Sequence, residues 1–448
     1  MKKEKTVYIL GAGASVSAGL PTQVGILSTI FTISEANIKK EVELSDFMSL
    51  DIDNNNQRLE DLYETFDKDR QELGEFIIEN FSTSEKLEQY ELALRKANDI
   101  KNSEVDKSKM ILNEAYEIAK SVTVSLEDLF TIFDNINSGR EHFRLYSQSS
   151  MSEMHDKLKM CVIYAISYLR LKHCNNADYE KFAEMLLKTR LKATLTEDVI
   201  SVITMNWDDI LEHVLFEKCR EYNADKKHNG QKILPDLCFY NYDFKQNKKH
   251  IPSIQIKAKG IKNIKILKMH GSLAWLECPK CGRIFTDFSE EIAYKAAINL
   301  ECPICTAEED YFDREAPALR NLIITPTFIK SLDNLNVKNI WQNALLDISR
   351  ASHIVFIGYS FPDADFEMRC LLKKSIKKSA KITVVLSEDD NPQKWRELFQ
   401  AKNVPEDTIE SILERMYLPE KRYQSFFGKD NVEFKYEGFC SYIDEMEA

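Results

Sequence analysis

Four cysteines form the pattern with the most specific chemistry in this sequence. Cys278 and Cys281 are separated by two residues, and after 20 more residues Cys302 and Cys305 repeat the pair. Two such pairs are typical of knuckles that close on a tetrahedral Zn²⁺ ion, whereas a redox site needs only one pair. Four thiolates leave no open coordination position, so we expect this zinc to be structural and not catalytic.

A second pattern is a glycine-rich turn after a short apolar run. Gly11, Gly13 and Gly19 give the spacing Gly-x-Gly-x5-Gly, which differs from the ordinary dinucleotide fingerprint. Glycines between a strand and a helix let the backbone approach a pyrophosphate, whose charge is met by the amides at the helix N-terminus. The alternative is a purely structural tight turn, since such turns use glycine in any case.

Polar residues follow two further apolar runs. Asn206 and Asp208 lie at the end of one, and His270 lies at the end of another. The carboxyl ends of parallel strands are where open sheets place ligands, and histidine is the natural general base at neutral pH. The alternatives are that Asn206 or Asp208 caps the following helix and that His270 is a satisfied structural group.

A last polar segment runs from Gly358 through Ser360 to Asp363 and Asp365, where a strand leads into a turn and a helix. Two interpretations stay open. Ser360 and Asp363 cap that helix, or the backbone at Gly358 accepts a nucleotide.

The elements that must position these residues alternate between strands and helices. Apolar runs that predict strands occupy residues 6–10, 199–205, 264–270, 322–324, 353–360, 381–387 and 431–437. Helical patterns follow most of them, and such alternation favours a parallel sheet. Between residues 35 and 192 the apolar spacing is instead three and four throughout, which predicts helices, and Ser125 with Asp128 forms a capping box.

The predicted fold class is therefore α/β: a doubly wound, Rossmann-like parallel sheet with a large helical insertion and a small zinc ribbon. We expect the sheet domain at residues 1–34, 193–275 and 311–448, the insertion at 35–192 and the ribbon at 276–310. The turn-forming residues agree, because Pro21 and Pro235 bound 213 residues without proline.

Composition excludes several functional classes. The chain has 448 residues, of which 44% are hydrophobic and 29% charged, with a formal net charge of −12. A broad nucleic-acid surface is disfavoured by this charge, so we expect no direct nucleic-acid binding. The sequence has no apolar run long enough for a membrane helix, its N-terminus indicates a strand and not a signal peptide, and six cysteines are scattered without a framework. We therefore expect a cytoplasmic protein.

The order of the motifs resembles the sirtuin fold. The glycine turn, the Asn206 and Asp208 strand end, the His-Gly-Ser that begins at His270, the two cysteine knuckles and the Gly-x-Ser at Gly358 follow in the sirtuin order. The details are most similar to the sirtuin-like NAD-hydrolases of bacterial antiphage defence. The long helical insertion and the Gly-Tyr-Ser-Phe-Pro-Asp-Ala-Asp stretch resemble that group.

The resemblance implies NAD as the substrate and a set of site residues. Asn206 would orient the water and the ribose hydroxyls, Asp208 would lie in the nicotinamide pocket, and His270 would act as the base. The residues that would hold the dinucleotide are Gly11, Ala12, Gly13, Ser15, Gly19, Asn206, Asp208, Gly358 and Ser360. The implied activity is hydrolysis of NAD to nicotinamide and ADP-ribose.

Departures from the pattern of protein-deacylating sirtuins leave two alternatives. Leu20-Pro21 continues into Thr22-Gln23 where deacylases have Asp-Phe-Arg, and residues 324–327 replace their Phe-Gly-Glu segment. The alternatives are an NAD-dependent protein deacylase and a non-catalytic module that senses NAD or ADP-ribose. Because unregulated NAD hydrolysis would poison its host, we also expect a homo-oligomer and a partner or sensor protein encoded nearby, such as an ATPase.

Overall fold

The structure is a computed structural model that describes most of the chain. The described residues are 4–33, 52–100, 105–139, 141–172, 175–228, 231–236, 261–286, 301–307, 317–327, 330, 332, 334–416 and 419–447. The expected helical segment at 35–51 and the loop between the two cysteine pairs at 287–300 lie outside them. Among the described residues, no helix is long and apolar enough to cross a membrane.

The chain forms two compact units. The first comprises Met1–Ala18, Asn175–Ile324 and Ser331–Ala448, and we call it the sheet unit. The second comprises Gly19–Cys174 and Thr325–Lys330, and we call it the helical unit.

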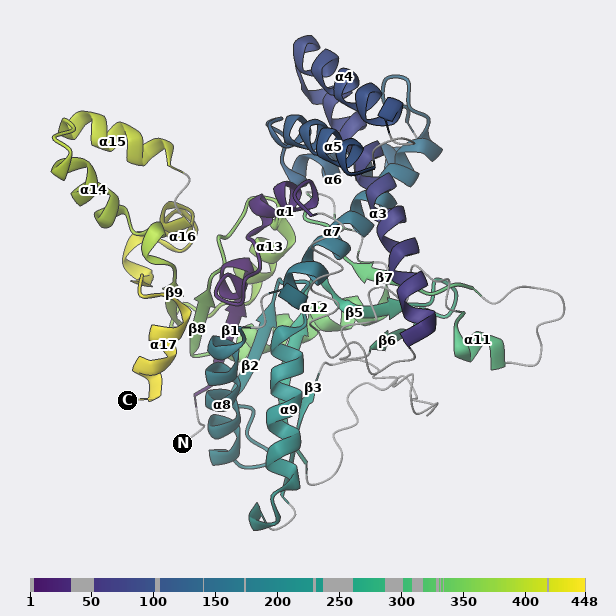
Figure 1. Cartoon of the computed structure of the whole chain (residues 1–448). Helices are drawn as coiled ribbons and strands as arrows, with labels where there is room; N and C mark the ends of the chain where they lie inside the picture. The colour runs from purple at the N-terminus through teal and green to yellow at the C-terminus, as the bar shows by residue number, and fades with distance from the viewer. Residues whose placement is uncertain are drawn as a thin grey trace. The chain divides into compact units, whose positions relative to one another are not determined.

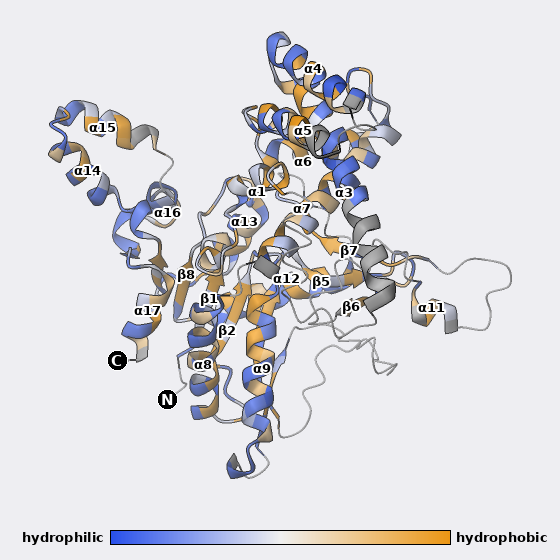
Figure 2. Cartoon of the chain, viewed as in Figure 1, coloured by the Kyte–Doolittle hydropathy of each residue, from blue (hydrophilic) through white to orange (hydrophobic). Residues whose placement is uncertain are grey.

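The sheet unit is built on seven parallel strands in the order β10-β9-β8-β1-β2-β4-β3, which confirms the predicted fold class (Figure 1). The strands are β1 (Thr6–Leu10), β2 (Ile200–Thr204), β3 (Lys232–Asp236), β4 (Ile261–Lys268), β8 (His353–Ile357), β9 (Lys381–Val385) and β10 (Glu433–Lys435). The central strands are continuous apolar runs (Figure 2). Such runs form central parallel strands because both faces are buried.

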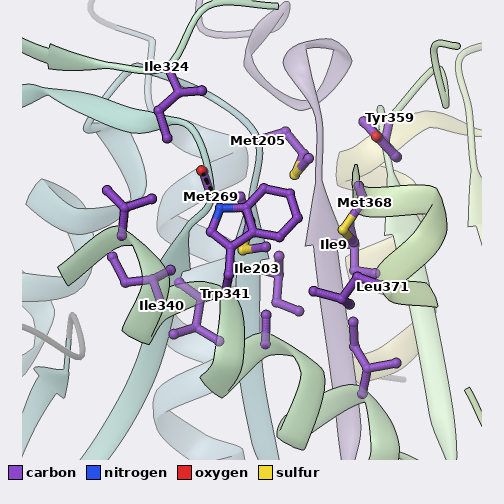
Figure 3. Packing of buried hydrophobic residues seen from close by; sticks show 14 of the residues in the cluster. Ile9, Ile203, Met205, Met269, Ile324, Ile340, Trp341, Tyr359, Met368 and Leu371 are labelled. Carbon is purple, nitrogen blue, oxygen red and sulfur yellow. Dashed lines mark hydrogen bonds between the residues drawn. The ribbon is translucent and has the colours of Figure 1, made fainter. Parts of the chain in front are cut away.

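Helices cover both faces of the sheet, as two successive residues of β1 show. Tyr8 packs edge-on against Phe182 of α8 (Ala177–Lys192), with ring centroids 5.2 Å apart. Ile9 belongs to the core that includes Trp341 of α12 (Leu335–Arg350) and Leu371 of α13 (Phe366–Ser375) (Figure 3). Successive strand residues point to opposite faces, so the sheet is doubly wound.

The boundaries of the compact units differ from the ranges expected for the domains. Residues 177–192 were expected in the helical insertion, but α8 belongs to the sheet unit because its aromatic face packs on β1. Conversely, α1 (Gln23–Ile30) was expected with the sheet and belongs to the helical unit. The other helices in the described part of the sheet unit are α9 (Ile210–Ala224), α11 (Pro303–Ala307), α14 (Pro392–Ala401), α15 (Glu406–Arg415), α16 (Pro419–Phe427) and α17 (Gly438–Glu447).

A second, three-stranded antiparallel sheet carries the cysteines. Its order is β6-β5-β7, with β5 at Gly271–Glu277, β6 at Ile284–Thr286 and β7 at Arg320–Ile323. Trp275, Cys278 and Phe285 share one buried core with the residues of the main sheet. This small sheet is therefore packed onto the larger sheet and is not a separate module.

Among its described residues, the helical unit contains α1 and five longer helices. These are α3 (Ile52–Phe81), α4 (Ser84–Ile100), α5 (Val105–Lys120), α6 (Leu126–Gly139) and α7 (Gln148–Lys172). The predicted capping box is present, because Asp128 N donates to Ser125 Oγ at 3.0 Å and Ser125 N donates to the Asp128 carboxylate at 3.2 Å. The large helical insertion is thus confirmed as part of the fold.

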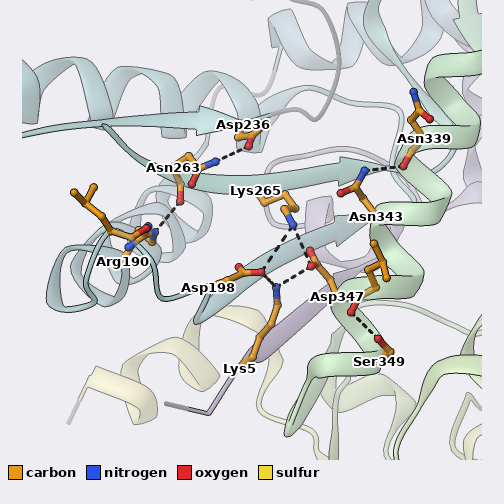
Figure 4. A network of polar contacts seen from close by, with 12 residues as sticks. Lys5, Arg190, Asp198, Asp236, Asn263, Lys265, Asn339, Asn343, Asp347 and Ser349 are labelled. Atoms are coloured by element: carbon orange, nitrogen blue, oxygen red, sulfur yellow. Dashed lines mark hydrogen bonds and ion pairs between the residues drawn. The ribbon is translucent and has the colours of Figure 1, made fainter. Parts of the chain in front are cut away.

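A buried charge network ties together the strand beginnings, at the edge opposite the polar motifs. Lys5 Nζ lies 2.6 Å from Asp198 Oδ2 and 2.8 Å from Asp347 Oδ1, and Lys265 Nζ lies 3.0 Å from Asp347 Oδ1 (Figure 4). Each cation is paired with a carboxylate, which offsets the cost of removing these charges from water. The network joins β1 and β4 to α12 and so fixes the sheet on which the site depends.

Candidate functional site

The site lies where the strand order reverses. β1 pairs with β2 on one side and with β8, which comes much later in the chain, on the other. The strand ends are in register, because Leu10 is level with both Thr204 and Ile357. In open parallel sheets, ligands bind beyond the carboxyl ends of the strands at such a reversal.

The glycines after β1 and β8 bring two loops into direct backbone contact. Gly11 N donates to Ile357 O at 3.0 Å and Gly13 N donates to Gly358 O at 2.8 Å. Gly358 has a φ of +58°, and a Cβ atom there would lie 2.1 Å from Ala14 N. No larger residue fits, so these glycines are required by the packing of the two loops. Gly13 is itself exposed.

A buried polar network connects this turn to the end of β2. Ser15 Oγ lies 2.8 Å from Tyr179 Oη, 2.9 Å from Asp208 Oδ2 and 3.1 Å from Asn206 Nδ2. Asn206 Nδ2 also donates to Gly11 O at 3.0 Å. Each of these side chains is at least nine-tenths buried. The structure thus brings together Gly11, Ser15, Asn206 and Asp208, which the sequence separates by about 190 residues.

The capping alternative accounts for only part of these contacts. Asp208 Oδ1 accepts from Ile210 N at 3.3 Å, at the first residue of α9, whereas Asp208 Oδ2 faces Ser15. The Asn206 side chain donates to Gly11 and Ser15, away from the helix. One carboxylate oxygen therefore supports the helix start, and the remaining groups form the network.

Burial fixes the protonation state of one member of the network, Tyr179. Burial, followed by the charge of Asp208, raises the pKa of the Tyr179 phenol well above its usual range, so its hydroxyl stays protonated at neutral pH. Beneath Asp208, Lys268 lies 2.6 Å from Glu212 and donates to Asp208 O. Burial raises the pKa of the Glu212 carboxyl, and Lys268 opposes that rise.

His270 occupies the turn between β4 and β5 and faces an acid from another loop. Its Nε2 atom lies 3.5 Å from Asp365 Oδ1, and both side chains are buried. The Tyr359 hydroxyl donates to Asp365 Oδ2 at 2.7 Å. The turn is fixed by Gly271, whose φ is +76°, and by Ile324 N, which donates to His270 O at 2.8 Å. The arrangement supplies a potential base beside a carboxylate that can orient it.

Two predicted ligand residues lie outside the buried network and the contact between the two glycine loops. Ser360 is exposed, and Gly19, with a φ of +88°, belongs to the helical unit. The proposed caps of α13 are not formed, because its first flanking residue is Asp365 and Asp363 instead pairs with Arg369.

Sequence reasoning missed several groups that complete the site. Tyr179 gave no signal, because an amphipathic helix can bury a tyrosine anywhere. Lys268 and Glu212 belong to a strand and a helix whose patterns do not show that they pair. Asp365 belongs to the polar segment that follows Gly358, but the sequence does not show that it pairs with His270, which is 95 positions away.

The four cysteines form a centre whose geometry fits a zinc ion. Their sulfur atoms all lie within 4.8 Å of one another, with Cys278 to Cys305 at 3.8 Å and Cys281 to Cys302 at 3.9 Å. A tetrahedral ion with Zn–S bonds of about 2.3 Å requires sulfur separations of about 3.8 Å. The residues therefore fit zinc, which would join the β5–β6 turn to α11.

Comparisons with known proteins match one part of the chain to a family model. Residues 200–405 match the family model described as a SIR2-like domain, which includes Asn206, Asp208, His270 and the cysteines. No curated protein matches the sequence.

Solved structures with some likeness include sirtuin complexes. A Sir2 homologue in complex with NAD is 12% identical over 99% of this chain and 88% of that chain, with a TM-score of 0.37. A Sir2 complex with a p53 peptide and NAD⁺ is 12% identical over 99% of this chain and 91% of that chain, with a TM-score of 0.33.

Proposed function

We propose that the protein hydrolyses NAD to nicotinamide and ADP-ribose. The observation that carries the proposal is the buried Ser15, Asn206 and Asp208 network at the strand reversal, close in the fold to the end of β4 that bears His270. The match of residues 200–405 to a SIR2-like domain supports a substrate of this class.

The chemistry of NAD explains why such a site suffices. Nicotinamide is a cationic pyridinium in NAD and departs as a neutral ring, so its departure needs no general acid, unlike that of an ordinary sugar leaving group. The enzyme must stabilise positive charge that develops on the ribose and activate a nucleophile. An amide, a carboxylate and an imidazole are the groups that perform these two tasks.

We assign a role to each group on this basis. Asn206 orients the attacking water and the ribose hydroxyls, Asp208 receives the nicotinamide end, and His270 accepts a proton from a ribose hydroxyl or from water. The backbone of Gly11, Ala12 and Gly13, with Ser15, Gly19, Gly358 and Ser360, holds the dinucleotide. The exposure of Gly13 and Ser360 supports access of a ligand to these loops.

We further propose that activity is controlled, as an effector of antiphage defence that depletes NAD in the cytoplasm. The chain passes from the sheet unit to the helical unit at the Ile324–Thr325 bond. Ile324 holds the His270 carbonyl, and Thr325 Oγ1 donates to Asp134 Oδ2 of α6 at 3.1 Å. This connection supports a helical unit that responds to self-assembly or to a partner such as an ATPase.

The test is product analysis with variants. The purified chain, alone and with the protein encoded beside it, should release nicotinamide and ADP-ribose from NAD. His270→Ala and Asn206→Ala should lower the rate by about 100-fold or more while both variants stay folded. His142→Ala removes an exposed histidine of the helical unit and serves as the matched control. Full turnover in both site variants would refute the assignment.

A further inference from the structure

The Asp365 carboxylate is directed away from the helix that it precedes. It occupies the residue before the first turn of α13, where aspartate commonly caps the helix, yet it makes no side-chain capping bond. Its oxygens instead lie 3.5 Å from His270 Nε2 and 2.7 Å from the Tyr359 hydroxyl. A buried carboxylate that faces a histidine and does not cap its own helix is a candidate for a functional role.

The loop that carries Asp365 is held in one conformation by aromatic packing. Phe361 is fully buried and has a φ of +54°, which costs a non-glycine residue roughly 1–2 kcal/mol. Its ring stacks on Tyr423 with centroids 4.9 Å apart and lies beneath the Arg369 guanidinium. The Tyr423 hydroxyl donates to Tyr359 O at 2.7 Å. Helix α16 thereby fixes both Tyr359 and the loop.

We propose that Asp365 is the positioning residue that orients His270 and selects its tautomer, with Tyr359 setting the orientation of the carboxylate. This inference rests on the proposed NAD hydrolysis for its kinetic consequence. The 3.5 Å separation is an ion-pair distance, and His270 Nε2 makes no hydrogen bond to the residues that the structure describes. In the active arrangement the Nε2–H group donates a hydrogen bond to the Asp365 carboxylate, which leaves the lone pair on Nδ1 to act as the base. The carboxylate also stabilises the imidazolium that forms when His270 takes up a proton.

The Tyr359 hydroxyl makes the proposal testable by a pair of substitutions. In D365N, the hydroxyl should retain the amide oxygen as its acceptor, which turns the amide NH₂ toward His270 Nε2. That orientation stabilises the wrong tautomer, with the proton on Nδ1, and removes the base. In D365N/Y359F, no hydroxyl fixes the amide, so its oxygen can turn to Nε2 and restore the tautomer.

The kinetic test compares these variants under the conditions in which the parent hydrolyses NAD. D365N should lower kcat by about 10²–10⁴-fold with little change in KM. Y359F should lower kcat by less than about tenfold, and D365N/Y359F should be at least about tenfold faster than D365N. A merely structural role predicts additive losses, so a double variant no faster than D365N would overturn the proposal. A kcat of D365N within threefold of the parent would overturn it as well.

A second measurement is independent of activity. The ¹⁵N spectrum of histidine-labelled protein reports the tautomer of each ring, and H270A identifies the signals of His270 among the eight histidines. The parent should show the proton on Nε2, D365N should show it on Nδ1, and D365N/Y359F should return it to Nε2. An unchanged tautomer in D365N would contradict the inference even if the protein does not hydrolyse NAD, and a changed one would support it.

Discussion

At the residue scale, Gly358 shows how a predicted ligand position can be required by packing. Its positive φ and its contact with Ala14 N follow from the close approach of the loops after β1 and β8. The sequence pattern predicted that glycine is needed at these turns. It could not distinguish a bound ligand from a tight turn, because both require glycine at the same positions. The requirement from packing is visible only in the distances between the two backbones, because residues 13 and 358 are far apart in the chain.

This contact predicts a strong effect of a single methyl group. Gly358→Ala should lower the free energy of unfolding by at least about 2 kcal/mol, because the added carbon combines a positive φ with a clash. The matched control is Gly438→Ala, whose φ is +79° but whose added carbon meets nothing within 4 Å, so only the conformational cost of about 1–2 kcal/mol remains. Denaturant titration measures both, and equal losses would contradict the account.

A second residue predicts a pH effect in the helical unit. Burial raises the pKa of Asp69 on α3 to about 6, with the nearby Lys157 opposing the rise. The folded form therefore favours the protonated acid. The contribution of Asp69 to the free energy of unfolding is most favourable below its ordinary pKa near 4 and is lost as the pH rises through about 6.

Asp69→Asn should consequently stabilise the helical unit at pH 7.5 by on the order of 2 kcal/mol and have little effect at pH 4. Hydrogen exchange of α3 and α7 at the two pH values measures this difference. Asp156→Asn on α7 is a comparison for the loss of one charge. A variant that is less stable at pH 7.5 would show that the Asp69 carboxylate is satisfied in the fold.

At the element scale, the main sheet was largely predictable and its neighbours were not. Strands β1, β2, β8 and β9 are apolar runs that end at glycine or polar residues, and such runs mark buried parallel strands. Strand β5 was missed because only Met269 and His270 lie between it and β4, and the glycine that makes the turn, Gly271, is already its first residue.

Helix α8 shows a second limit of pattern reading. Its amphipathic spacing predicts a helix, but the same spacing does not say which surface receives the apolar face. Residues 177–192 were therefore expected in the insertion, although Tyr179 and Phe182 pack toward β1 and its turn. This packing brings the Tyr179 hydroxyl to Ser15.

The small sheet carries the prediction that belongs to this scale. Metal analysis should find about one zinc per chain, and Cys278→Ser or Cys302→Ser should abolish it, with hydrogen exchange rising across β5 and β6. Hydrogen exchange should rise because the bound zinc contributes on the order of 10 kcal/mol to local folding. Cys370→Ser, outside the quartet, is the control and should retain the metal. A well-folded parent with no metal and four free thiols would refute the zinc assignment.

At the scale of the whole molecule, a single chain combines a sheet unit that carries the candidate site and a helical unit inserted into its sequence. Four of the five motifs were predictable because each follows a strand of the parallel sheet, and the cysteine quartet was predictable from its spacing. The pairing of His270 with Asp365, and the participation of Tyr179, required the folded arrangement.

Identification of the products formed from NAD distinguishes hydrolysis from deacylation and from binding without turnover. The full chain, alone and with its candidate partner, is incubated with NAD in the presence and absence of an acetyl-lysine peptide. We predict equimolar nicotinamide and ADP-ribose whose rate of formation does not depend on the peptide. Acetylated ADP-ribose formed only with the peptide, or binding of NAD without turnover under every activating condition, would contradict the claim.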